Sequence, residues 1–182
     1  MNAMEPLWLL FLLTFLTGLV GKLSDGHIEH GLDFFPLAGL LFASLFGLLW
    51  GYVMTRSPVL MTGFTGLVFF WIWKLTWDHH YHAISLIILL CFALNSPHPL
   101  DTPAALTIGT AHALFHWFKN HPPTACQMAH GLFYRFRLDF LLIPLSYSLF
   151  AGPEGMVIYA FFIGIVVTNR IFRIPKAAVT RG

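Results

Sequence analysis

Seven apolar stretches that hold almost no charged residues make up most of this sequence. A segment that crosses lipid hydrocarbon must satisfy its own backbone hydrogen bonds, so each stretch is expected to be a helix. We therefore predict an all-α, polytopic integral membrane bundle of about seven transmembrane helices, forming a single domain over residues 1–182. The predicted helices span residues 7–21, 34–54, 58–77, 82–95, 102–118, 138–151 and 155–170.

The composition supports a membrane protein and excludes several other classes. Apolar residues make up 57% of the chain and charged residues only 10%, a balance that the core of a water-soluble protein of 182 residues could not bury. Disordered and disulfide-stapled chains are excluded, because both need a different composition and there are only two cysteines. The net charge of +2, without a dense run of Lys and Arg, argues against a nucleic-acid partner.

The basic residues predict how the chain is oriented. If the seven helices alternate in direction, Arg56 falls on one side of the membrane and every other Lys and Arg on the opposite side. Loops rich in Lys and Arg stay in the cytoplasm, which places the N-terminus outside and the C-terminus inside. A re-entrant hairpin in place of two short neighbouring helices would leave this orientation unchanged. The expected location is a bacterial inner membrane.

The same orientation gathers imidazole and carboxylate groups at the cytoplasmic end of the predicted bundle. Of the ten histidines, His98 alone falls on the outer side. The middle of the predicted bundle is almost entirely apolar, and polar groups placed in or near a membrane are candidates for function. This asymmetry is the main functional signal in the sequence.

The first histidine cluster lies between the first two predicted helices. His27 and His30 are three residues apart, so a helical turn would face both imidazoles the same way, with Asp33 one turn further on. Two imidazoles and a carboxylate form a common ligand set for Zn or non-haem Fe. The alternative is that Asp25 caps a short interfacial helix and the histidines are solvated.

The second cluster joins the third and fourth predicted helices and contains Asp78, His79, His80 and His82. A turn can direct two of these imidazoles inward. Asp78 would then bind a metal directly or hold one histidine in the correct tautomer. The alternative is an interfacial loop whose rings lie among lipid headgroups.

The third cluster is the pair His112 and His116, four residues apart on the fifth predicted helix. This spacing places both imidazoles on one face of a helix. His112 lies about 7 Å deeper than Trp117 by helical rise. The alternative is that one imidazole forms a hydrogen bond between helices and serves only packing.

Arg135 and Arg137 precede the sixth predicted helix. Their guanidinium groups can bind a phosphate with paired hydrogen bonds, and we interpret them as a site for a substrate headgroup. The alternative is that they anchor the helix to anionic lipid.

Together these clusters predict a metal-dependent membrane enzyme that acts on a lipid or another membrane-soluble substrate. Asp33 and Asp78 would act as catalytic carboxylates, as a ligand, a partner of a ligand or a general base. Zinc would imply hydrolysis by a metal-bound hydroxide, and iron would imply oxidation. Hydrolysis or group transfer is favoured because no H-x-x-H-H segment, typical of oxidative membrane enzymes, occurs. The predicted metal ligands are His27, His30, His79, His80, His82, His112 and His116.

Two alternatives come from other functional classes. Histidines on separate helices could ligate a b-type haem, for example His112 or His116 with His27 or His82, in a redox or assembly module. The chain could also be a non-enzymatic subunit that contacts a partner membrane protein or a second copy of itself, with its histidines at the interface.

Overall fold

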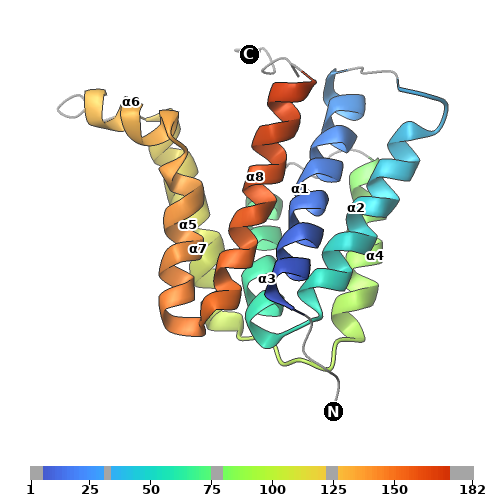
Figure 1. The fold of residues 1–182 in the computed structure, drawn as a ribbon, viewed down its shortest axis with the longest axis horizontal. Helices are drawn as coiled ribbons and strands as arrows, with labels where there is room; N and C mark the ends of the chain where they lie inside the picture. The colour runs from blue at the N-terminus through green and yellow to red at the C-terminus, as the bar shows by residue number, and fades with distance from the viewer. Residues whose placement is uncertain (1–5, 31–33, 75–79, 122–126, 173–182) are drawn as a thin grey trace. The chain divides into compact units, whose positions relative to one another are not determined.

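The computed structural model describes residues 6–30, 34–74, 80–121 and 127–172, and this part of the chain contains helices and turns but no strands (Figure 1). The predicted all-α class is confirmed for these residues. In chain order the elements are α1 (Leu7–His30), α2 (Ala38–Met54), α3 (Pro58–Trp73), α4 (His80–Leu94), α5 (Thr102–Asn120), α6 (Gln127–Arg135), α7 (Leu138–Ala151), the 3₁₀ helix η2 (Pro153–Met156) and α8 (Val157–Ile171).

The chain divides into two compact units, and each is assembled from segments that are distant in sequence. The first unit contains α1, α2, α4 and most of α8, within Met1–Val53, Asp78–Asn95 and Ala160–Gly182. The second unit contains α3, α5, α6, α7 and η2, within Met54–Trp77 and Ser96–Tyr159. The single transmembrane domain over residues 1–182 stays a prediction.

In the first unit, α1 and α8 touch through their backbones. A Cβ atom on Gly18 would collide with the carbonyl oxygen of Phe161, and one on Gly164 would collide with the carbonyl oxygen of Phe15. Helices that must pack without a hydrophobic driving force often approach through such small residues. Beside this contact the ring of Trp50, on α2, lies 5.4 Å from the ring of Phe161.

The contact between α2 and α4 also belongs to the first unit. The hydroxyl of Ser85 donates a hydrogen bond of 2.8 Å to the carbonyl oxygen of Ala43. Gly47 lies at the same crossing, where a Cβ atom would come within 2.8 Å of the carbonyl oxygen of Ser85. A buried interhelical hydrogen bond and a glycine therefore fix how closely these two helices pack.

The second unit is built around α3. The helix begins where Ser57 caps it by accepting from the backbone N–H of Leu60, with a proline at the first helical position. The backbone N–H of Asp101, just before α5, donates to the hydroxyl of Thr62 over 3.2 Å. The phenol of Tyr147, on α7, donates to the carbonyl oxygen of Val59 over 3.0 Å. These contacts join α5 and α7 to the start of α3.

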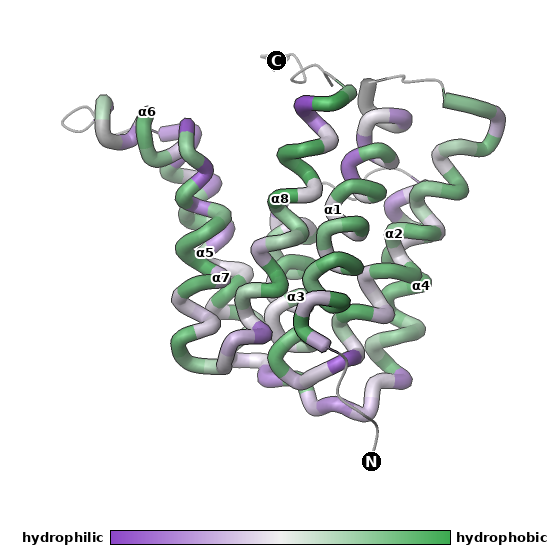
Figure 2. Tube along the Cα trace, in the orientation of Figure 1, coloured by the Kyte–Doolittle hydropathy of each residue, from purple (hydrophilic) through white to green (hydrophobic). Residues whose placement is uncertain are grey.

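Within the described residues, two helical segments are long and apolar enough to cross a membrane by length and composition: Leu7–His27, with 21 residues, and Pro153–Ile171, with 19 residues. Figure 2 shows hydrophobic residues along most of the length of the helices in both units. Four further apolar helices, α2, α3, α4 and α7, are shorter. Helix length alone therefore supports fewer crossings than the seven that the sequence predicts.

Three local differences from the sequence prediction concern the polar segments. The first helix continues to His30 instead of ending at Gly21, so Asp25 and His27 lie on its last turns rather than in a loop. Helix α4 begins at His80, two residues before the predicted start. Helix α6 forms in a stretch where no helix was predicted.

Candidate functional site

Titratable side chains meet in the first unit where the last turns of α1 approach the first turn of α4. The Nε2 atom of His82 lies 3.5 Å from Oδ1 of Asp25, and Nζ of Lys22 lies 3.3 Å from Oδ2 of the same carboxylate. The side chains of His82 and Lys22 are mostly buried, at 12% and 16% exposure. One carboxylate on α1 therefore holds a cation of its own helix and an imidazole of α4.

His27 and Tyr81 extend this group toward α2. Their ring centroids lie 6.4 Å apart, and both rings sit against Gly39, where a Cβ atom would collide with them. The exposed ring of His80 lies 4.2 Å from the ring of Tyr81. We call Lys22, Asp25, His27, Tyr81 and His82 the α1–α4 cluster.

The α1–α4 cluster offers a carboxylate oxygen and an imidazole nitrogen that face each other from two helices. Among the described residues, no three or more His, Cys, Asp or Glu side chains are grouped closely enough to hold a metal ion. Some predicted ligands belong to other parts of the chain: His30 ends α1 but its side chain is outside the described residues, as are Asp33, Asp78 and His79. His112 and His116 belong to the second unit.

In the second unit, His112 and His116 point toward α3. The ring of Phe70 lies 5.6 Å from the ring of His112 and 5.9 Å from that of His116. His112 is buried, with 4% of its surface exposed, whereas His116 is partly exposed and lies 3.3 Å from the amide of Asn120. The two imidazoles thus share one helix face and one aromatic neighbour.

The two predicted headgroup arginines occupy different local structures. Arg135 is exposed at the last residue of α6, and Arg137 precedes α7 in the left-handed region, with φ of 57°. The guanidinium of Arg137 lies 4.6 Å above the ring of Phe140, a cation–π contact. Their joint binding of a phosphate stays a prediction.

Helix α6 is joined to the end of α5 by hydrogen bonds. The phenol of Tyr134 donates to the carbonyl oxygen of Phe115 over 2.6 Å, and Nε2 of His130 lies 2.8 Å from the carbonyl oxygen of Phe118. Burial raises the pKa of Tyr134, and the nearby carboxylate of Asp139 raises this pKa further. The phenol therefore stays protonated at neutral pH and remains a donor.

The sequence prediction did not include Asp25, Lys22 or Asp139 as site residues. Asp139 is buried in the first turn of α7, and its Oδ1 has no hydrogen-bond partner among the residues that the structure describes. The available signal was a lone carboxylate inside an apolar predicted helix. The i,i+3 spacing of Lys22 and Asp25 is typical of an ion pair within a continuing helix. No neighbouring residue in the sequence indicates the contact of Asp25 with His82.

Comparison of the chain with known proteins found no match to any family model, curated protein or solved structure.

Proposed function

We propose that the chain is an integral protein of a bacterial inner membrane with seven spanning helices, α1 to α5, α7 and α8, its N-terminus outside and its C-terminus in the cytoplasm. Exposed leucines support this arrangement. On α2, Leu41, Leu45 and Leu48 are 45%, 38% and 47% exposed, and their spacing places them on one side of the helix. Lipid is the solvent in which such a stripe is stable.

Helix α6 fits the same arrangement as an element that does not span. It has nine residues and combines exposed Met128 and Leu132 with the polar side chains of Gln127 and Arg135. A short amphipathic helix of this kind lies in the plane of the membrane interface. The chain then crosses the membrane once in α5 and returns in α7.

We further propose that the α1–α4 cluster binds a Zn or Fe ion and that the protein is an enzyme acting on a lipid or another membrane-soluble substrate. The observation that carries this proposal is the approach of His82 Nε2 to Asp25 Oδ1. These atoms are a nitrogen and an oxygen ligand of the types that both metals accept. The ammonium of Lys22 already occupies one side of the carboxylate, so a metal would have to compete with it.

The proposed chemistry is hydrolysis or group transfer. Bound zinc would supply an activated water at neutral pH. His27 is the second imidazole of the cluster, and Asp33 and Asp78 are the proposed general bases. Arg135 and Arg137 are the proposed contacts of a phosphate headgroup.

Elemental analysis of the detergent-purified protein tests the metal. We expect one Zn or Fe per chain, lost in Asp25→Asn and in His82→Ala. His121→Ala is the matched control, because His121 is an exposed imidazole in the second unit and its loss should leave the metal content unchanged. A metal-free wild-type protein, or variants with unchanged metal content, would overturn the metal proposal. A Soret band in the visible spectrum would instead identify haem.

A second candidate, a non-enzymatic membrane subunit, is favoured by one observation. The Lys22–Asp25 ion pair together with His82 gives the carboxylate two partners without any metal. In such a subunit the cluster would only join α1 to α4. Asp25→Asn and His82→Ala would then lower the melting temperature of a protein that contains no metal in either form.

A further inference from the structure

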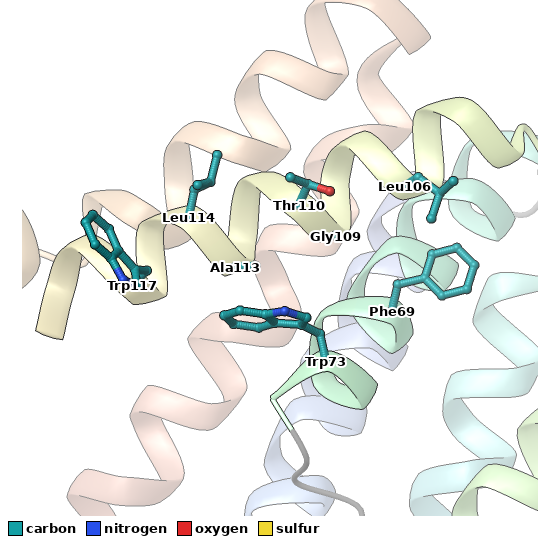
Figure 3. A pocket seen from close by; sticks show the side chains of 8 residues that line it. All are labelled: Phe69, Trp73, Leu106, Gly109, Thr110, Ala113, Leu114 and Trp117. Carbon is teal, nitrogen blue, oxygen red and sulfur yellow. The ribbon is translucent and has the colours of Figure 1, made fainter. Parts of the chain in front are cut away.

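An apolar groove of about 560 Å³ lies between α3 and α5 in the second unit. Figure 3 shows Phe69 and Trp73 facing α5 from α3, with the α5 residues arranged along the opposite side. Its volume is within the usual range for small-molecule sites. The lining residues are Phe69, Trp73, Leu106, Gly109, Thr110, Ala113, Leu114 and Trp117.

The groove is elongated along α5 and is lined mainly by apolar side chains (Figure 3). It follows α5 from Leu106 to Trp117, a distance of about 16 Å by helical rise. Gly109 and Ala113 are small residues that leave space along this side of α5. At Gly109 the two helices are in close contact, because a Cβ atom there would come within 2.9 Å of the carbonyl oxygen of Gly66. Apart from two indole N–H groups and the hydroxyl of Thr110, the lining side chains offer no hydrogen bonds.

Two lysines stand at the indole end of the groove. Lys74 follows Trp73 directly at the end of α3, and Lys119 lies in the last turn of α5, two residues after Trp117. Asp101 contacts Thr62 near the start of α3, and His116 contacts Phe70 near its end, so α3 and α5 run in the same direction. The lysines at the ends of these helices therefore lie at the same end of the unit. Both lysines are exposed.

We propose that the groove binds one acyl chain of an anionic phospholipid, whose phosphate is bound by Lys74 and Lys119. The apolar lining matches the chain, and the two cations match the headgroup. The indoles of Trp73 and Trp117 lie between these two regions, where amphipathic rings prefer the headgroup boundary. The basic end faces the cytoplasmic leaflet, which carries anionic lipid. The site is separate from the α1–α4 cluster and rests on the membrane location and orientation in the proposed function.

Quenching of tryptophan fluorescence by brominated lipid chains tests this site. The full-length protein is reconstituted in nanodiscs that contain brominated phosphatidylglycerol or brominated phosphatidylcholine in an unbrominated background. Because each lysine near a membrane surface contributes about fivefold to binding of anionic lipid, the two lysines together should make phosphatidylglycerol preferred by about 25-fold. The Trp73→Phe/Trp117→Phe variant should lose most of this lipid-specific quenching.

Two variants separate the headgroup from the chain. Lys74→Ala/Lys119→Ala should reduce the preference for phosphatidylglycerol to about twofold or less. Arg56→Ala, which removes an exposed cation of the same unit just before the start of α3, should not. Ala113→Leu fills the groove and should reduce quenching by both lipids. Thr107→Leu adds bulk to an exposed α5 position outside the groove and should leave quenching unchanged.

Equal quenching by the two lipids in wild-type protein, or an unchanged preference in the lysine variant, overturns the proposal. The lysine variant decides the question even if Ala113→Leu fails to fold. The proposal is also overturned if the wild-type protein is a dimer without lipid-specific quenching and Ala113→Leu converts it to a monomer. The groove would then be a protein interface. Failure of the protein to enter nanodiscs would refute the membrane location itself, and metal content is measured independently of all these results.

Discussion

The imidazole of His82 on α4 lies 3.5 Å from the carboxylate of Asp25 on α1, and the carboxylate is held from its other side by Lys22. The sequence places Asp25 and His82 in two different clusters, separated by two complete helices. Their approach makes the end of the first unit one site with residues from both clusters. It also gives α1 and α4 a polar contact between two helices that are mostly apolar.

A double-mutant cycle measures this contact. Asp25→Asn and His82→Ala should each lower the free energy of unfolding, and the double variant should be less destabilised than the sum of the two by about 1 kcal/mol. The physical reason is that the interaction can be lost only once. Unfolding by a denaturing detergent, followed by circular dichroism, gives the four free energies. Strict additivity would show that the two side chains do not interact.

The backbone contact between α1 and α8 predicts a strong effect at Gly18. Gly18→Ala places a methyl group against the carbonyl oxygen of Phe161, which belongs to rigid helix backbone. The helices must separate, and overpacking of this kind costs about 1–3 kcal/mol. The melting temperature of the purified protein should fall accordingly.

Gly131→Ala is the control for this prediction. A Cβ atom on Gly131 meets nothing within 4 Å, and the residue lies inside α6. Alanine is the better helix former by up to about 1 kcal/mol, so stability should stay the same or rise slightly. Equal loss of stability in the two variants would contradict the close packing of α1 and α8.

The hydrogen bond between α4 and α2 predicts a smaller effect. Ser85→Ala removes the buried hydroxyl that donates to Ala43 and should cost about 0.6 kcal/mol, the usual value between membrane helices. The control is Thr107→Ala, because the Thr107 hydroxyl is exposed and donates only within its own helix, to Pro103. The two variants are compared by thermal unfolding. A destabilisation of Thr107→Ala as large as that of Ser85→Ala would remove the interhelical explanation.

Much of the fold could be predicted from local signals. Helix α3 begins at Pro58, where a serine cap and a proline coincide, and α7 covers the range Leu138–Ala151 expected for the sixth apolar stretch. The predicted end of the first helix at residue 21 is wrong, because the charged residues that follow do not end the helix. Lys22 and Asp25 pair across one turn and let it continue to His30. Helix α6 is not predicted from the sequence because it has only nine residues and its interior contains Gly131.

The candidate site could be predicted only in part, since spacing along the chain reports one helix face at a time. The spacing of His112 and His116 correctly placed both imidazoles on one face, but it could not indicate that Phe70 lies against them. In the same way, nothing near Asp25 in the sequence points to His82. Contacts between helices depend on the packing of the whole unit, including glycines such as Gly39 that make room for the rings.

The seven-span arrangement predicts that the turn after α4 and helix α6 lie on opposite sides of the membrane. With both native cysteines replaced, single cysteines at Pro97 and Gly131 occupy exposed positions. In intact cells or spheroplasts, an impermeant maleimide should label Pro97→Cys from outside, because this turn belongs to the side that carries Arg56. It should label Gly131→Cys only after the membrane is opened, because α6 precedes Arg135 and Arg137 on the basic side. If both positions are labelled from the same side, the chain crosses the membrane an even number of times, or not at all, between them. This result would refute a single crossing through α5.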